Sequence, residues 1–544
     1  MALGALALAP APASAIVSTD PARLYVEARA AAMNGNHVRS AELFAALADA
    51  QPDSADIARK ALSEAIGAGQ MQLALGLAAK LPPTKLPTEA RLLLASDELK
   101  RHRLDRALAW LKGSGENADL SFLAPMLTAW DYAERGDADR AIAAIDQIPA
   151  NTLLSPLQPE QRALILLKFK RVADAEPSAR RAIGTAGARE IRLRLAFADG
   201  FLAAGDRARA LAMIDGMGSE AAGARQRIAA GKTSGAGIDN ASEALSEVLT
   251  AFGADLARLQ RSAPPIGLVQ VARYADPRNS GATTLLALLL EGDNRTAEAL
   301  ALLRSIPRDD PLTSQVQDAQ VRVFSENKMY NDAFAIASAA ANRPNATSGD
   351  YSRLGDVYQS MKRYNEAADA YARAIALANA QGLRPQTWPL LLLQANSFEE
   401  AGRWPDTKQA LTQALALAPE QPLLLNFMGY SKLEHGEDLD AAEAMIRKAN
   451  ALAPDDASIT DSLGWALFKR GKMEDAIATL QKAAEKDPDQ AAIQEHLGDA
   501  LFKSGRRYEA RFAWNAALIT AEDDVAGRVK AKLLNGLSSS NAAP

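Results

Sequence analysis

Cysteine is absent from the chain. This absence excludes structural disulfides, thiolate metal sites, a cysteine nucleophile and a lipid anchor attached to an N-terminal cysteine. Aromatic residues make up only 5% of the 544 residues, although hydrophobic residues make up 48%. We therefore expect a core built mainly of alanine and leucine.

A large excess of charge is also missing. Lys and Arg number 61 against 66 Asp and Glu, which leaves a formal net charge of -5. Nucleic-acid recognition needs a basic face with a large charge excess, so we expect no nucleic-acid partner. No apolar run in the sequence approaches the roughly eighteen residues that span a bilayer, and we expect no transmembrane segment.

The sequence lacks a recognisable site for catalysis, a cofactor or a metal. The four histidines show no metal-ligand spacing, and no Gly-x-Ser-x-Gly motif is present. Gly231-Lys232-Thr233 resembles the end of a phosphate-binding loop, but Gln226 stands where the first glycine is required and no apolar strand precedes it. We predict that the chain is not an enzyme and has no catalytic, cofactor-binding or metal-binding residues.

What the chain does contain is an alanine that returns every 34 residues. A second small residue stands twelve positions before most of these alanines, as Gly464 does before Ala476. Small residues at two fixed points allow two antiparallel helices to cross closely. An alanine-rich bundle also has a helical period, but not a second period of 34. The three series are Ala107, Ala141, Ala175; Ala299, Ala333, Ala367; and Ala442, Ala476, Ala510.

One repeat, residues 348–381, carries most of a known signature. Its signature residues are Tyr351, Leu354, Gly355, Tyr358, Ala367, Tyr371 and Ala374. With these residues the chain resembles the tetratricopeptide-repeat family. The resemblance implies an all-α, superhelical solenoid of antiparallel helix pairs, and a non-enzymatic surface that holds a protein or peptide partner.

The C-terminal half resembles a narrower group. Phe427-Met428-Gly429-Tyr430, Asp461-Ser462-Leu463-Gly464-Trp465 and His496-Leu497-Gly498-Asp499 are similar to bacterial cell-envelope adaptors of this family. These adaptors are typified by an outer-membrane lipoprotein that activates a periplasmic carboxy-terminal processing protease. The resemblance implies an adaptor role with such a protease as partner. The chain departs from this group in lacking the lipidation cysteine, and its N-terminal half is only generically similar.

Composition changes along the chain predict its organisation. Ala13-Ser14-Ala15 follows a short apolar run and fits an export signal cleaved before Ile16, although no positive charge precedes it; the other interpretation is an alanine-rich leader that is not cleaved. Glycines cluster near residues 216–240, which predicts a linker between two solenoid arms. The expected parts are a signal peptide at 1–15, a degenerate solenoid at 18–215, the linker at 216–240, a second solenoid at 241–521, a capping helix at 523–537 and a disordered tail at 538–544.

The family's pattern places the binding residues on the first helix of each repeat, on the concave face. Large aromatic groups there, beside carboxylates and lysines, are typical of a protein interface, and the acidity favours a neutral or basic ligand. Trp465 and Phe468 have a second interpretation, as packing between repeats. The predicted binding residues are Asn426, Tyr430, Leu433, Asp461, Trp465, Phe468, Lys469, Glu495, Asp499, Phe502 and Lys503.

Two function classes follow from these observations. The first is a non-enzymatic adaptor in the bacterial periplasm. The second is a cytoplasmic assembly factor or regulator, if the leader is not cleaved. An enzyme with an unrecognised site is a distant third. The sequence names neither the partner nor the oligomeric state.

Overall fold

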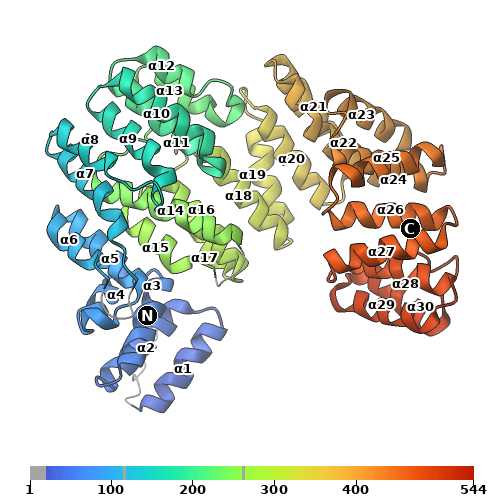
Figure 1. Cartoon of the computed structure of the whole chain (residues 1–544), viewed down its shortest axis with the longest axis horizontal. Helices are drawn as coiled ribbons and strands as arrows, with labels where there is room; N and C mark the ends of the chain where they lie inside the picture. The colour runs from blue at the N-terminus through green and yellow to red at the C-terminus, as the bar shows by residue number, and fades with distance from the viewer. Residues whose placement is uncertain (1–19, 114–117, 260–263, 544) are drawn as a thin grey trace, which may run out of the picture. The chain divides into compact units, whose positions relative to one another are not determined.

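The computed structural model describes residues 20–113, 118–259 and 264–543. Within these ranges every regular element is a helix and no strand is present. The expected export signal at 1–15 lies outside the described residues. The helices form two compact units, one reaching Ile336 and the other starting at Ala337; Figure 1 colours the chain from blue to red in this order.

Unit 1 contains α1 to α18, and α19 spans the division between the units. Short turns join the helices, and most helices pack on their neighbours in the sequence. The helices are α1 (Pro21–Met33), α2 (His37–Ala50), α3 (Ala55–Gly67), α4 (Met71–Ala78), α5 (Thr88–Lys100), α6 (Leu104–Leu111), α7 (Ala124–Glu134), α8 (Ala138–Asp146), α9 (Gln158–Lys168), α10 (Val172–Thr185), α11 (Glu190–Ala203), α12 (Arg207–Met213), α13 (Ala222–Ala229), α14 (Ala241–Leu259), α15 (Ile266–Ala275), α16 (Ser280–Gly292), α17 (Thr296–Ser305), α18 (Thr313–Glu326) and α19 (Tyr330–Ala341), with single 3₁₀ turns at η1 (Pro83–Lys85), η2 (Ser121–Leu123), η3 (Ser155–Leu157), η4 (Gly187–Arg189) and η5 (Gly218–Ala221).

The turn between α7 and α8 shows why the sequence folds into helix pairs. Gly136 has φ +80°, a left-handed conformation that ends a helix and that glycine adopts without strain. The side chain of Asp137 then accepts the backbone N–H of Arg140 and starts the next helix. Ala129 and Ala141 are fully buried, one in each helix, as the 34-residue period predicts. The predicted all-α fold of antiparallel helix pairs is confirmed.

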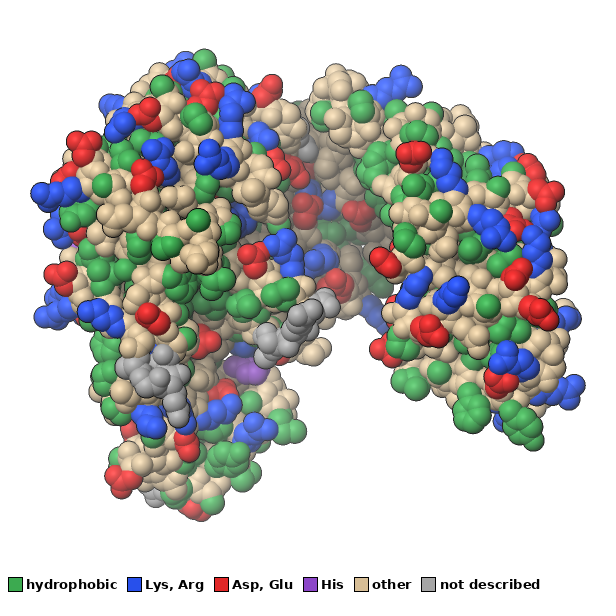
Figure 2. Space-filling view, in the orientation of Figure 1, with side chains coloured by type: hydrophobic (Ala, Val, Ile, Leu, Met, Phe, Trp, Pro, Cys, Tyr) green, Lys and Arg blue, Asp and Glu red, His purple; other side chains and the backbone are tan. Residues whose placement is uncertain are grey.

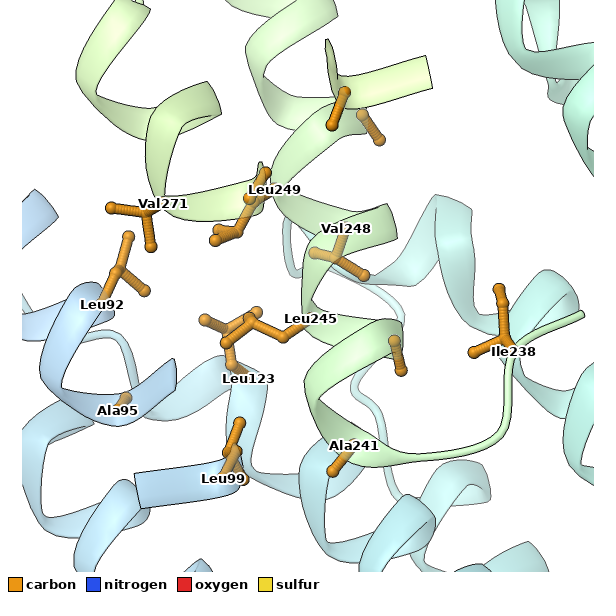
Figure 3. Close-up of a cluster of buried hydrophobic side chains, with 14 of the residues drawn as sticks. Leu92, Ala95, Leu99, Leu123, Ile238, Ala241, Leu245, Val248, Leu249 and Val271 are labelled. Carbon is orange, nitrogen blue, oxygen red and sulfur yellow. The ribbon is translucent and has the colours of Figure 1, made fainter. Parts of the chain in front are cut away.

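Helix α14 lies at the centre of unit 1, and it does not begin a second solenoid. It packs against α5 and α7, which are far earlier in the sequence. Its Leu245 lies beside Leu123, and its Leu249 lies on the side of Leu92 of α5 and Val271 (Figure 3); all five side chains are buried. The boundaries expected for two solenoid arms, 18–215 and 241–521, therefore do not match the two units of the structure. Helices α14 and α15 belong to unit 1 because their apolar side chains complete the core of the earlier helices. The division between the units falls after Ile336.

The glycine-rich segment 216–240 is part of unit 1 and does not form the expected linker. The carboxylate of Asp199 on α11 accepts the backbone N–H groups of Ser234, Gly235 and Ala236 at 2.6, 2.9 and 2.8 Å. Ile238 is buried beside them. A buried carboxylate that collects several amide donors holds a loop without regular structure, and glycine density alone does not reveal it.

Replacing Asp199 by alanine is expected to release this loop. The variant leaves amide donors buried without an acceptor, a cost of about 1–3 kcal/mol. Limited trypsin digestion should then cut first at Lys232, an exposed residue within the loop, whereas the wild-type chain resists cleavage there. Asp215→Ala, at a side chain that is 80% exposed, is the control. Equal cleavage of the wild-type chain and the Asp199 variant at Lys232 would show that these hydrogen bonds do not hold the loop.

Unit 2 is a regular series of helix pairs. In four of its five helix pairs a glycine of the first helix faces a large side chain sixteen or seventeen residues later, and the pair within 388–417 has no glycine in its first helix. A Cβ added at Gly464 would lie 2.6 Å from Leu480, and one added at Gly498 would lie 2.3 Å from Trp514, so the helices approach closely only because glycine has no side chain. The helices are α20 (Ser348–Ser360), α21 (Tyr364–Ala380), α22 (Trp388–Glu400), α23 (Trp404–Leu417), α24 (Pro422–Glu434), α25 (Leu439–Leu452), α26 (Ala457–Lys469), α27 (Met473–Lys486), α28 (Ala491–Lys503), α29 (Arg507–Thr520) and α30 (Asp523–Asn535), with a 3₁₀ turn η6 (Arg384–Gln386).

The C-terminal end of unit 2 differs in part from the expectation. The capping helix expected at 523–537 is α30, which ends at Asn535 and packs Val529 into the core. The tail expected to be disordered at 538–544 is ordered through Ala543 and turns back onto unit 2. Its Asn541 and Ala543 are buried, because Asn541 hydrogen-bonds within the turn and Ala543 packs on apolar side chains.

Candidate functional site

The predicted binding residues lie on three neighbouring helices. Helices α24, α26 and α28 are the first helices of successive pairs, and each contacts the next. We call the surface that carries the predicted residues on these helices the first-helix face. Helix α24 carries Asn426, Tyr430 and Leu433; α26 carries Asp461, Trp465, Phe468 and Lys469; and α28 carries Glu495, Asp499, Phe502 and Lys503.

Burial divides this set into three groups. Leu433, Asp461, Trp465, Glu495 and Asp499 are buried, so they are not open contact residues in this structure. Asn426, Tyr430, Phe468 and Phe502 are partly buried, and Lys469 and Lys503 are exposed. The sequence placed the residues on the correct helices but overestimated how many of them face solvent.

Trp465 forms the centre of a stack of three rings. Its ring lies 4.7 Å from Phe468 and 4.2 Å from His496, nearly parallel to both. The Nζ of Lys469 lies 5.2 Å from the Trp465 centroid, within cation–π range. The second interpretation, packing between repeats, therefore holds for Trp465, while Phe468 and Lys469 form the accessible edge of the stack.

His496 is held by a carboxylate of the preceding pair. Its Nδ1 lies 2.8 Å from Asp461 Oδ2. Burial lowers the pKa of His496, but the charge and hydrogen bond of Asp461 outweigh burial and the net pKa is raised. The sequence carries no signal for this pair, because the two residues stand 35 positions apart and a histidine in a helix is ordinarily a surface residue.

Helix α30 neutralises part of the expected acidity. Lys532 Nζ lies 2.6 Å from Glu495 Oε1 and 2.7 Å from Asp499 Oδ2, and Arg528 also pairs with Glu495. Burial raises the pKa of Asp499. For Glu495 burial also raises the pKa, but Arg528 and Lys532 outweigh it and hold the pKa below its ordinary value. The acidity of Glu495 and Asp499 favoured a neutral or basic ligand. In the structure these two carboxylates already pair with Arg528 and Lys532 of the same chain.

Several buried polar atoms on the first-helix face lack a partner. Asn426 Oδ1, Asp461 Oδ1 and Trp465 Nε1 make no hydrogen bond within the described residues. Trp465 is 1% exposed and Asp461 is 7% exposed. Buried polar groups ordinarily find a partner, because leaving one unpaired costs free energy. A bound chain with amide N–H and C=O groups can supply these partners.

Unit 1 contains a separate cavity of about 480 Å³. Its charged lining includes Arg189, Arg192 and Glu247. Arg192 pairs with Glu247 at 2.7 Å, and Arg189 pairs with Glu160 at 2.9 Å. These three charged groups of the lining are therefore paired within the protein.

The other sequence motifs form no catalytic or metal constellation in the described residues. No group of three or more metal-binding side chains occurs in the ranges that the structure covers. Helix α13, not a strand, precedes Gly231, which argues against a phosphate-binding loop. His435 stacks on Trp404 and His102 lies beside Glu134. Over the same ranges no helix is both long and apolar enough to span a bilayer.

Two stretches of the chain match models of a known repeat family. Residues 351–381 match the model described as tetratricopeptide repeat, and residues 464–505 match the one described as TPR repeat. These stretches coincide with α20 and α21 and with the α26–α28 region. The chain therefore contains tetratricopeptide repeats, whose stacked helix pairs form surfaces for binding other proteins.

A curated relative supports the same repeat type. The chain is 26% identical over 195 residues to a TPR repeat-containing protein of Pseudomonas aeruginosa. The match covers 35% of this chain and 31% of the relative. The chain thus spans about a third of the length of the curated relative that it matches.

Solved structures show likeness at low scores. The chain resembles the APC/C assembly Cut9–Hcn1 at 16% identity and a TM-score of 0.36, with 95% of this chain and 91% of that chain covered. Yeast Tom70 is 13% identical at a TM-score of 0.33, with 94% of this chain and 96% of that chain covered. MamA is 21% identical at a TM-score of 0.26, with 31% of this chain and 94% of that chain covered. TM-scores below 0.5 do not establish a shared arrangement, and the assigned fold rests on the helices of this chain.

Proposed function

We propose that the chain is a non-enzymatic scaffold that binds a protein or peptide on the first-helix face of unit 2. Tyr430, Phe468 and Phe502 are partly exposed rings on three adjacent helices, and exposed Lys469 and Lys503 flank them. Aromatic anchors at the centre and charged groups at the rim are the usual composition of a protein interface.

The observation that carries this proposal is the set of unpaired buried atoms on the same face. Asp461 Oδ1 and Asn426 Oδ1 are acceptors, and Trp465 Nε1 is a donor; none has a partner among the described residues. An extended peptide offers both amide donors and carbonyl acceptors at regular spacing. Binding of a peptide backbone therefore supplies the hydrogen bonds that this face lacks.

The proposal extends to the bacterial cell envelope, with a periplasmic carboxy-terminal processing protease as partner. The support is the sequence: Ala13-Ser14-Ala15 fits a cleaved export signal, and the C-terminal half resembles envelope adaptors. The alternative is a cytoplasmic assembly factor. Fusion of residues 1–20 to a reporter that is active only outside the cytoplasm separates these two locations.

Photo-crosslinking tests the proposed face directly. A benzophenone amino acid placed at Phe502 should crosslink to a partner in extract of the source organism. The matched position is Phe512, which is 76% exposed on α29. The same substitution there should not crosslink to that partner.

The control position also tests a second surface. Tyr508, Phe512 and Ile519 are highly exposed on α29, and Leu534 is exposed on α30; Figure 2 shows hydrophobic side chains at this end of unit 2. Crosslinks from position 512 and none from position 502 would assign binding to this outer surface and overturn the proposed one. Circular dichroism of both variants confirms that they are folded.

A further inference from the structure

The chain's own C-terminal segment, residues 536–543, lies on the first-helix face. It begins at Gly536, where α30 ends and the backbone takes φ +79°. A Cβ at this position would lie 2.9 Å from Phe502 Cζ. Only glycine fits here without strain, because both the conformation and the contact exclude a side chain. The chain therefore reverses its direction directly against one of the predicted binding residues.

Asn541 holds the reversed segment in shape. Its Nδ2 donates to the carbonyl oxygen of Gly536 at 2.9 Å, and its Oδ1 accepts the N–H of Ser538 at 2.7 Å. Asn541 is 7% exposed, whereas Ser538 is exposed. The side chain of Asn541 thus closes a compact turn. Ordering this turn lowers the conformational entropy of the segment, and a favourable contact must offset that loss.

Ala543 provides that contact. It is 4% exposed and belongs to a cluster with Leu433 and Trp465, against which Tyr430 and Phe468 pack. Its N–H donates to Asp499 Oδ2 at 3.1 Å, the oxygen that also pairs with Lys532. A buried apolar side chain and one backbone hydrogen bond therefore hold the end of the segment on unit 2.

The segment covers the face that the proposed function assigns to a partner. Gly536 and Ala543 contact Phe502 and Asp499 of α28, and Ala543 belongs to the cluster that contains Trp465 of α26 and Leu433 of α24. This overlap is not a property of a capping helix, because α30 ends before the segment begins.

From these contacts we infer that residues 536–543 are an internal ligand of the first-helix face, which a partner must displace. This inference rests on the proposed function. The ligand chemistry is that of the segment itself: a turn-forming peptide with a small apolar residue in the cluster of Trp465 and a backbone N–H directed at Asp499. Within the described residues the segment leaves Asp461 Oδ1, Asn426 Oδ1 and Trp465 Nε1 unpaired. A partner peptide that satisfies these atoms outcompetes it.

The inference is tested in the full chain with a synthetic peptide of residues 536–543 that carries a fluorophore. A tethered segment competes at an effective concentration on the order of millimolar. Ala543→Arg places a large charged group in the buried position and should free the face. Fluorescence anisotropy should then show the added peptide binding at least about tenfold more tightly to this variant than to the wild-type chain.

Ala542→Arg is the matched control, because Ala542 is the exposed neighbour and receives the same substitution. It should bind the peptide as weakly as the wild-type chain does. Asn541→Ala, which opens the turn without adding charge, should increase binding as Ala543→Arg does. Circular dichroism confirms that each variant is folded.

Equal binding of the peptide to the wild-type chain and the Ala543 variant would overturn the inference. Absence of binding to the Ala543 and Asn541 variants would also overturn it, because the freed face then has no affinity for the segment. The proposed function fails separately. If peptide binding rises in Ala543→Arg but no crosslink forms from position 502, the segment is an internal ligand of a face that no partner uses.

Discussion

Lys532→Met is expected to destabilise the packing of α30 on α28 by about 3–5 kcal/mol, because it leaves the buried carboxylate of Asp499 without its cation. Lys532 is fully buried, and the side chains of Glu495 and Asp499 are each 1% exposed. Methionine keeps most of the volume of lysine, so the lost charge dominates the effect. Arg528 still pairs with Glu495, and Asp499 becomes the unpaired group.

Hydrogen–deuterium exchange measures this effect locally. The amides of α30 should lose roughly two to four orders of magnitude of protection in the variant, because local opening becomes easier by that free energy. Lys530→Met is the control on the same helix, since Lys530 is exposed and should change stability by less than about 0.5 kcal/mol. Similar protection in the two variants would mean that the buried ion pairs do not hold α30 in place.

Trp465→Ala is expected to cost about 3–5 kcal/mol of folding stability, the usual price of removing a buried aromatic ring. The ring is 1% exposed and stacks between Phe468 and His496. The sequence pattern placed Trp465 and Phe502 among the binding residues, and truncation of open contact residues would keep most of the melting temperature. The burial of the Trp465 ring contradicts that expectation.

Thermal denaturation followed by circular dichroism distinguishes the two outcomes. The Trp465 variant should melt at a clearly lower temperature, whereas Phe512→Ala, at a ring that is 76% exposed, should melt close to the wild-type chain. An unchanged melting temperature for Trp465→Ala would return this residue to the set of open contact residues.

The fold could be predicted from sequence because its determinants are local and periodic. Gly464 and Leu480 must meet at one crossing, so the spacing between them is restricted in each repeat and the period is visible in the sequence. The helices that carry the candidate site follow from the same register. This is why Trp465, Asp499 and Phe502 lie on the helices where the pattern placed them.

The burial of those residues could not be predicted, because it depends on contacts outside the repeat. Asp499 is covered by Lys532 and Ala543, which lie 33 and 44 residues later in the sequence. From sequence, a helical lysine such as Lys532 is expected to be exposed to solvent, and a tail of serine and alanine is expected to be disordered. The linker expected at 216–240 was wrong for the same reason. Asp199, which holds this loop, lies 35 or more residues earlier in the sequence.

The central position of α14 has a consequence for how unit 1 is made. In an ordinary repeat array each new repeat docks on the one before, so folding proceeds as the chain leaves the ribosome. Here Ala241 bonds to Glu134 across 107 residues, and α14 also packs on α5. Until α14 has been synthesised, the earlier helices keep an apolar surface uncovered. Unit 1 therefore completes its core only after α14 has been synthesised, and a nascent chain that stalls before α14 keeps this apolar surface in contact with solvent.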